Sequence, residues 1–190
     1  MKRILVLSAI IFSAYVSSAF VRTFLIQTYY IPTISMTPTL NVNDRVLVIK
    51  KKLISGINYG DIIIFYPNGK IKSNLDILID SLNINKLINF RSNDIVYIKR
   101  VIGKEYDSVK LMSDGVVLVN GVKQISINDI MDLHFEEQNW NVPKGQYFVL
   151  GDNLLNSNDS RSYGFINDVD VVGKAWLKIY PFDKIELLND

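Results

Sequence analysis

The chain has 190 residues, of which 48% are hydrophobic and 21% are charged, and its formal net charge is +2. This length and composition suit one globular domain behind an N-terminal segment. The near-neutral charge argues against a nucleic-acid partner, because nucleic-acid-binding domains usually present a basic face. There is no cysteine, and His134 is the single histidine. Disulfides, thiolate metal sites and histidine-cluster metal sites are therefore excluded.

Residues 4–21 carry no charge and predict a membrane-spanning helix. Eighteen helical residues span roughly 27 Å, close to the thickness of about 30 Å of a bilayer core. Basic residues precede the segment, which favours a cytoplasmic N-terminus and an external remainder. A cleaved signal peptide is the alternative, since residues 17–19 have the small-x-small form of a cleavage site. We expect residues 1–22 to be the membrane anchor and residues 23–190 to be an extracytoplasmic domain.

Ser35 follows the anchor and lies between Pro32 and Pro38. Proline fixes its own φ and restricts the preceding residue to extended conformations. The segment is therefore expected to hold Ser35 on a stiff, extended backbone. It could also be an ordinary turn.

The rest of the chain reads mostly as β-strands. Apolar and β-branched runs predict strands over residues 44–51, 62–66, 95–102, 146–150 and 171–180. No strand–helix alternation is present, and neither a phosphate-binding loop nor a dinucleotide glycine motif occurs, so we expect no cofactor. The fold class expected is mainly β, an antiparallel β-sheet or barrel preceded by one transmembrane helix.

Two shorter stretches depart from simple strands. Residues 71–90 repeat apolar side chains at helical spacing, which predicts a helical insertion with a helix near 73–83. Asp114-Gly115 and Asn120-Gly121 predict type I′ turns, and so a β-meander within about residues 104–142.

Lys99 interrupts the apolar pattern of the strand at 95–102. Lys99 and Arg100 are adjacent and must point to opposite faces, so one of them is expected to face the interior or a cleft. An edge-strand charge that discourages aggregation is the alternative for Lys99.

Ser35 and Lys99 suggest one chemistry when they are taken together. A serine hydroxyl needs a base to become a good nucleophile, and His134 has an unremarkable loop-like setting. Burial can lower the pKa of a lysine by up to about 3–5 units, which lets its neutral amine act as that base. The residues therefore predict a Ser-Lys dyad.

Four motifs follow one another along the chain: Ile31-Pro32-x-x-Ser35-Met36-x-Pro38-Thr39-Leu40, Gly60-Asp61-Ile62, Tyr97-Ile98-Lys99-Arg100-Val101-Ile102-Gly103 and Gly151-Asp152-Asn153-x-x-Asn156-Ser157-x-Asp159-Ser160-Arg161-x-x-Gly164. In this order and spacing they resemble the motifs of type I signal peptidases over nearly the whole length of the chain. The resemblance implies that Ser35 attacks the scissile carbonyl to form an acyl-enzyme and that Lys99 is the general base. It also implies that the Ser35 N–H and the Thr33 hydroxyl form the oxyanion hole.

The resemblance implies supporting roles for four residues of the polar loop. Ser157 would hydrogen-bond the lysine amine, and Asp159 and Arg161 would form an ion pair with Asp152 nearby. Turn formation and capping are the alternative roles for these residue types.

The resemblance further implies that substrates are cleaved after a small-x-small motif and lie extended between two strands. Residues expected at the substrate are Tyr30, Ile31, Met36, Leu40, Tyr97 and Ile98.

Two residues near the expected oxyanion hole depart from the pattern of the family. Ile34 stands where many relatives have a small residue and makes positive φ improbable, and Thr33 stands where some relatives have serine.

The resemblance implies a membrane-bound serine endopeptidase that removes signal peptides from exported preproteins on the outer face of the cytoplasmic membrane. Its partners would be preproteins and the lipid bilayer. Two alternatives remain: a self-cleaving repressor-like Ser-Lys peptidase, and a non-catalytic membrane-tethered β-domain that binds partners.

Overall fold

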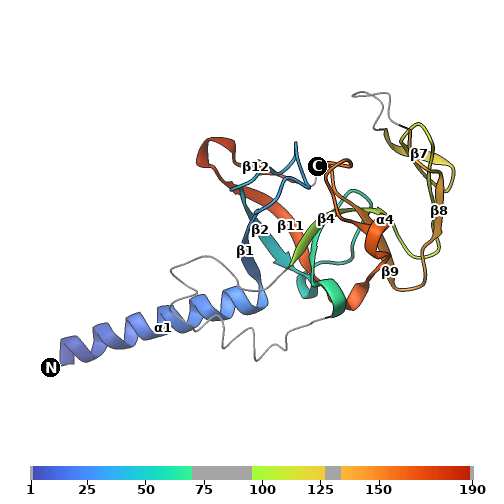
Figure 1. Cartoon of the computed structure of the whole chain (residues 1–190). Helices are drawn as coiled ribbons and strands as arrows, with labels where there is room; N and C mark the ends of the chain where they lie inside the picture. Colours follow the sequence, from blue (N-terminus) through green and yellow to red (C-terminus); the bar gives the residue numbers. More distant parts are fainter. Residues whose placement is uncertain (1, 70–95, 127–133, 189–190) are drawn as a thin grey trace.

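The computed structural model describes residues 2–69, 96–126 and 134–188, to which all statements on structure refer (Figure 1). The elements in chain order are α1 (Lys2–Phe24), β1 (Ile26–Tyr30), β2 (Arg45–Lys50), β3 (Ile62–Phe65), β4 (Tyr97–Gly103), β5 (Ser108–Leu111), β6 (Val116–Val119), β7 (Val122–Ser126), β8 (Gln138–Asn141), β9 (Gln146–Leu150), α4 (Ser160–Tyr163), β10 (Ile166–Asn167), β11 (Val171–Tyr180) and β12 (Glu186–Leu187). The mainly β fold class is confirmed.

Helix α1 projects away from the strands (Figure 1). It is long and apolar enough to cross a membrane, and few of its side chains are buried. It continues to Phe24, two residues beyond the expected anchor, and it contains residues 17–19. Length and composition fit both an anchor and a signal peptide, so the choice of an anchor over residues 1–22 stays a prediction.

Most strands form one large antiparallel sheet in the order β1-β2-β11-β3-β4-β9-β10, with β12 paired to β11. Its strands include those predicted around residues 44–51, 62–66, 95–102, 146–150 and 171–180. Strand β4 lies between β3 and β9. The edge-strand explanation of Lys99 is wrong, because its side chain is buried, with only 5% exposed, and is not a solvated charge at a sheet edge.

The second sheet has the order β7-β6-β5-β8 and contains the predicted meander. Asn120 and Gly121 both have positive φ, 51° and 80°, as the predicted type I′ turn requires. The type I′ prediction for Asp114-Gly115 is wrong, because only Gly115 has positive φ. The Gly115 N–H donates to the Met112 carbonyl, and the Met112 N–H donates to Val116. This pattern is a three-residue loop with a glycine bulge.

A buried apolar cluster lies between the curled edges of the large sheet. Its members come from β1, β2, β3, β4, β11, the segment after β1 and the residue after β12: Tyr29, Ile31, Met36, Leu40, Val46, Val48, Ile62, Ile64, Ile98, Ala175 and Leu188. Because Ile31 and Ile98 share this cluster, β1 and β4 face one core although three strands separate them in the sheet. The helix expected near 73–83 lies outside the described residues.

Gly173 marks the closest approach of two central strands and provides a test of the fold. A Cβ at this position would lie 2.1 Å from the Ile49 carbonyl oxygen of β2. We expect Gly173→Ala to lower the free energy of unfolding by about 1–3 kcal/mol, because backbone must move to relieve the overlap. Chemical denaturation would measure the loss. Ser108→Thr adds a methyl group at an exposed strand position and should be near neutral, and equal effects of the two changes would contradict this packing.

Candidate active site

Ser35 lies in a compact turn after β1 and is only 7% exposed. The Ile34 carbonyl accepts hydrogen bonds from the Thr37 N–H and the Thr37 hydroxyl, and the Leu40 N–H donates to Met36. The segment is therefore turned where an extended backbone was expected, because local hydrogen bonds outweigh the bias that the prolines impose. Ile34 does not have positive φ, as its branched side chain predicts, and its side chain is exposed.

Lys99 reaches Ser35 from the middle of β4. Its Nζ lies 2.8 Å from the Ser35 Oγ and 2.9 Å from the Ile98 carbonyl oxygen, and Lys99 is 5% exposed. The ring of Tyr97, two residues earlier on the same face, lies 5.9 Å from the Nζ. The structure thus brings together the two residues that were predicted to form a dyad.

Burial lowers the pKa of Lys99 to about 8, while the negative charges of Asp159 and Asp152 act in the opposite direction. Desolvation has this effect because a charged ammonium is disfavoured away from water. Lys50 offers a comparison, since burial also lowers its pKa to about 8. Burial alone therefore does not distinguish the two lysines. They differ in their contacts, because the Lys50 Nζ donates to the Gln27 side chain whereas the Lys99 Nζ contacts the Ser35 hydroxyl.

Thr33 lies beside the nucleophile, with its Oγ1 at 3.3 Å from the Ser35 Oγ. Its hydroxyl is therefore near the place where an oxyanion would form, and its role there stays a prediction. Asn153 holds the same turn from the other side. Its N–H donates to the Ser35 carbonyl, and its Nδ2 donates to the Ile34 carbonyl and the Thr37 hydroxyl. Sequence reasoning included Asn153 in a motif but assigned it no role.

Gly151 allows the polar loop to pack directly on the nucleophile turn. A Cβ at Gly151 would lie 2.4 Å from the Ser35 carbonyl oxygen and 2.2 Å from the Ser157 Oγ. The Ser157 hydroxyl is buried and has no hydrogen-bond partner among residues 2–69, 96–126 and 134–188. The expected hydrogen bond from Ser157 to Lys99 is therefore absent from the structure. The Lys99 amine donates to Ser35 and Ile98 instead.

Asp159 and Arg161 form the expected ion pair. The Arg161 Nε and Nη2 donate to the two carboxylate oxygens at 2.8 Å and 2.9 Å, and Asp159 is fully buried. The same carboxylate accepts the Gly151 N–H at 3.1 Å and caps helix α4 through the Arg161 N–H. The pair thus joins α4 to the loop that contacts Ser35. Helix α4 was not predicted, because a single helical turn has no apolar periodicity.

Asp152 is paired with Arg100, a partner that sequence reasoning did not identify. The Arg100 Nε and Nη2 donate to the two oxygens of Asp152 at 2.8 Å and 2.6 Å. Arg100 is half-buried and also donates to the Gly60 carbonyl. Arg100 thus extends from β4 to the polar loop that follows β9. Opposite faces of β4 therefore serve one site.

The expected substrate residues divide into two groups. Ile31, Met36, Leu40 and Ile98 are all buried in the apolar cluster described above. Tyr30 and Tyr97 are partly exposed. The Tyr30 hydroxyl donates to Asn43, and Tyr97 lines a cavity of about 490 Å³ together with Phe65 and Tyr163. The substrate-binding roles of all six residues stay predictions. His134 is exposed in the segment before β8.

Comparison with known proteins was made over the whole chain. Residues 3–180 match the family model described as signal peptidase, peptidase S26. A probable signal peptidase I-2 from Synechocystis is 34% identical over 161 residues, covering 84% of this chain and 65% of that protein. Signal peptidase IB from Staphylococcus aureus is 31% identical over 171 residues, covering 80% of this chain and 76% of that protein. The chain thus spans slightly less than two thirds of the Synechocystis protein and about three quarters of the staphylococcal one.

A solved structure of a signal peptidase I from Enterococcus faecalis is similar over 64% of this chain and 97% of that chain, with 25% identity and a TM-score of 0.45. The family model covers nearly the full chain, and several relatives exceed 30% identity. The chain therefore belongs to the signal peptidase family, peptidase S26, and so to the serine peptidases, which are hydrolases.

Proposed function

We propose that this chain is a membrane-anchored endopeptidase that removes signal peptides from exported preproteins after a small-x-small motif. Ser35 is the nucleophile and Lys99 is its general base. The observation that carries the proposal is the contact of 2.8 Å between the Lys99 Nζ and the Ser35 Oγ, both in buried side chains. Family membership supports the reaction class, and the apolar helix α1 fits a membrane-anchored enzyme.

The reaction follows from the position of the lysine. The Ser35 Oγ attacks the scissile carbonyl carbon while its proton passes to the neutral Lys99 amine. The carbonyl oxygen becomes an oxyanion, which the Ser35 N–H and the Thr33 hydroxyl stabilise. Lys99 then protonates the leaving amine as the C–N bond breaks, which leaves the acyl group on Ser35. In the second half Lys99 takes a proton from a water molecule as the water oxygen attacks the ester carbon. The bond between that carbon and the Ser35 Oγ then breaks, the acyl group leaves as a carboxylic acid, and the Lys99 ammonium returns the proton to Ser35.

The pairing of β4 supports an extended substrate. Residues Tyr97 to Lys99 pair with β3, whereas the pairing between β4 and β9 begins only at Arg100. The edge of Tyr97 to Lys99 that faces away from β3 therefore pairs with no strand among the described residues, and this open edge lies next to the nucleophile. Within the part of the chain that the structure describes, strand β1 pairs only with β2, which leaves its outer edge unpaired as well. An extended peptide can add its backbone hydrogen bonds to such edges.

The cost of burying Lys99 favours catalysis over a binding role. Removing an ammonium from water is unfavourable, and a domain that only binds partners gains nothing from a lysine held against a serine. The repressor-like alternative predicts cleavage of the chain itself. The proposal predicts cleavage of a separate preprotein. The basic residues before α1 support a cytoplasmic N-terminus and a catalytic domain on the outer face of the membrane.

The dyad is tested by removing each member. We expect Ser35→Ala and Lys99→Ala each to reduce preprotein cleavage in detergent by more than about 10³-fold, since nucleophile and base act as a unit. Circular dichroism should show the same fold in both variants. Lys50→Met, which removes another buried lysine whose pKa burial also lowers to about 8, should retain cleavage. Normal cleavage by either dyad variant would show that the assignment is wrong.

The pKa of Lys99 predicts the pH dependence of the rate. The neutral amine is the active base, so kcat/KM should rise with pH and level off above a midpoint near 8, where burial places the pKa of Lys99. The measurement is initial cleavage rate against pH with a preprotein in detergent. A rate that falls as pH rises from 7 to about 9 would exclude a neutral lysine base.

Thr33 should contribute to oxyanion stabilisation. Thr33→Val keeps the shape of the side chain but removes the hydroxyl, and we expect kcat to fall by about 10²–10³-fold with little change in KM. Thr33→Ser keeps the hydroxyl and should stay near the wild-type rate. If both substitutions left kcat unchanged, the hydroxyl would have no part in the transition state.

A further inference from the structure

Asp159 and Asp152 lie close to the amine that must lose its charge. The Lys99 Nζ contacts Ser35, the Ser35 carbonyl packs on Gly151, and the Gly151 N–H donates to the Asp159 carboxylate at 3.1 Å. Asp152 is the next residue after Gly151. Each carboxylate favours the ammonium form of Lys99 and so opposes the effect of burial on its pKa.

Each carboxylate is bound by its own arginine through two hydrogen bonds. Arg161 holds Asp159 at 2.8 Å and 2.9 Å, and Arg100 holds Asp152 at 2.8 Å and 2.6 Å. A guanidinium group stays charged at all accessible pH values and matches a carboxylate geometrically. The two negative charges beside Lys99 are therefore each matched by a fixed positive charge.

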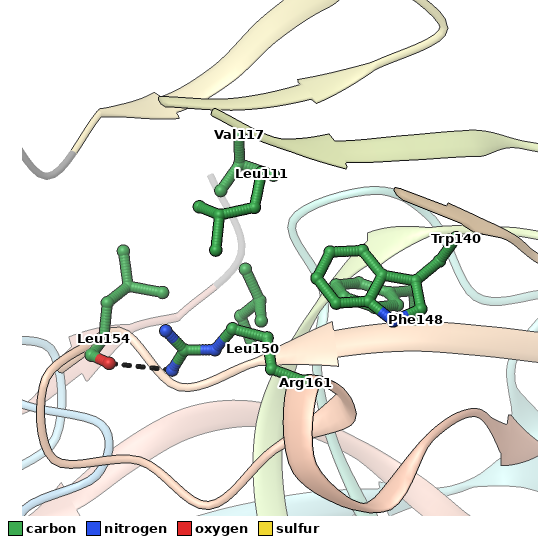
Figure 2. Close-up of a pocket in the computed structure, with 7 residues that line it drawn as sticks. All are labelled: Leu111, Val117, Trp140, Phe148, Leu150, Leu154 and Arg161. Atoms are coloured by element: carbon green, nitrogen blue, oxygen red, sulfur yellow. Dashed lines mark hydrogen bonds between the residues drawn. The ribbon is translucent and has the colours of Figure 1, made fainter. Parts of the chain in front are cut away.

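The surroundings of the Arg161–Asp159 pair limit screening by water. The Arg161 side chain runs beneath Leu111 and Val117 of the small sheet, beside Leu150, and its Nη2 donates to the Leu154 carbonyl (Figure 2). The gap that these side chains leave is too narrow to hold water. Interactions between charges are strong in such surroundings, because little solvent responds to them.

The other groups packed around Lys99 carry little charge. Thr33 and Ser35 on the nucleophile turn are neutral, and Tyr97 on β4 presents its ring 5.9 Å from the Lys99 Nζ. On α4, burial and Asp159 raise the pKa of Tyr163, so its phenol stays protonated. Strand β3 contributes only apolar residues, and Asp61 before it is bound to Lys174 at 2.6 Å.

We propose that Arg161 and Arg100 are positioning residues that cancel the charges of Asp159 and Asp152, and thereby keep the Lys99 amine neutral enough to accept the Ser35 proton. The carboxylates can then organise the loop around Ser35 without stabilising the ammonium form of Lys99. The consequence for catalysis rests on the function proposed above, whereas the electrostatic effect on Lys99 does not.

The test is a direct titration of Lys99 in the full chain. The protein, labelled with ¹³C at the lysine Cε and held in detergent micelles, is titrated by NMR, and the Lys99 signal is assigned by its loss in Lys99→Arg. Wild type should titrate near pH 8. Arg161→Met leaves the Asp159 charge unmatched and should raise the midpoint by about one unit or more. Arg100→Met should raise it by less, because the Arg100–Asp152 pair is more exposed.

Two controls separate charge from packing. The double variant Asp159→Asn/Arg161→Met removes both charges and should return the midpoint toward wild type. Lys50 has a similar pKa and lies outside this cluster, so its signal should not move in any variant. A Lys99 midpoint that stays at the wild-type value in folded Arg161→Met overturns the proposal, as does a double variant that behaves like the single one.

A second variant keeps the test decisive if Arg161→Met does not fold, since an unpaired buried carboxylate is strongly destabilising. Arg100→Met then decides: a raised midpoint supports the proposal, and an unchanged one overturns it. Measuring the cleavage rate against pH on the same samples distinguishes a failure of charge cancellation from a failure of the proposed peptidase function. If the NMR midpoint of Lys99 shifts and the kinetic midpoint does not follow, the lysine is not the base and the proposed function fails, while charge cancellation stands.

Discussion

The structure of the site depends on a hydrogen bond between the amine of Lys99 and the hydroxyl of Ser35 away from water. An amine that titrates near its ordinary pKa would be almost fully protonated at neutral pH and could not act as a base. Burial lowers the pKa of Lys99 to about 8 and so provides a useful neutral fraction. Lys99 is buried where β4 pairs with β3, and the turn that carries Ser35 lies against its amine.

The loop after β9 keeps the serine at the lysine. Gly151 packs on the Ser35 carbonyl, where a side chain would not fit, and Asn153 binds the same turn through backbone and side-chain hydrogen bonds. Asp159 and Asp152 brace this loop through ion pairs with arginines, of which the Asp159–Arg161 pair is the more buried. Carboxylates are good acceptors for loop N–H groups but unfavourable neighbours for a neutral lysine. The paired arginines reconcile these two demands.

Much of this site could be predicted from residue types and their order. Ser35 and Lys99 stood out because each is polar in an apolar or stiff setting, and the type I′ turn at Asn120-Gly121 follows from φ preferences alone. Contacts that depend on three-dimensional packing could not be predicted. The partner of Asp152 is Arg100, whose exposure depends on which strands pair, and the buried hydroxyl of Ser157 has no hydrogen-bond partner in the described part of the chain, although the resemblance implied one. Strand β8 was missed because Gln138–Asn141 is mostly polar.

The central claim is that Ser35 attacks the substrate, and trapping the acyl-enzyme tests it most directly. A preprotein is mixed with the full chain in detergent, the reaction is quenched in acid during turnover, and the enzyme is digested and mapped by mass spectrometry. The account predicts a signal-peptide acyl group esterified to Ser35, which disappears as cleavage is completed and does not form in Lys99→Ala. Cleavage that proceeds with no acyl group on Ser35, or with one on another residue, would contradict the account.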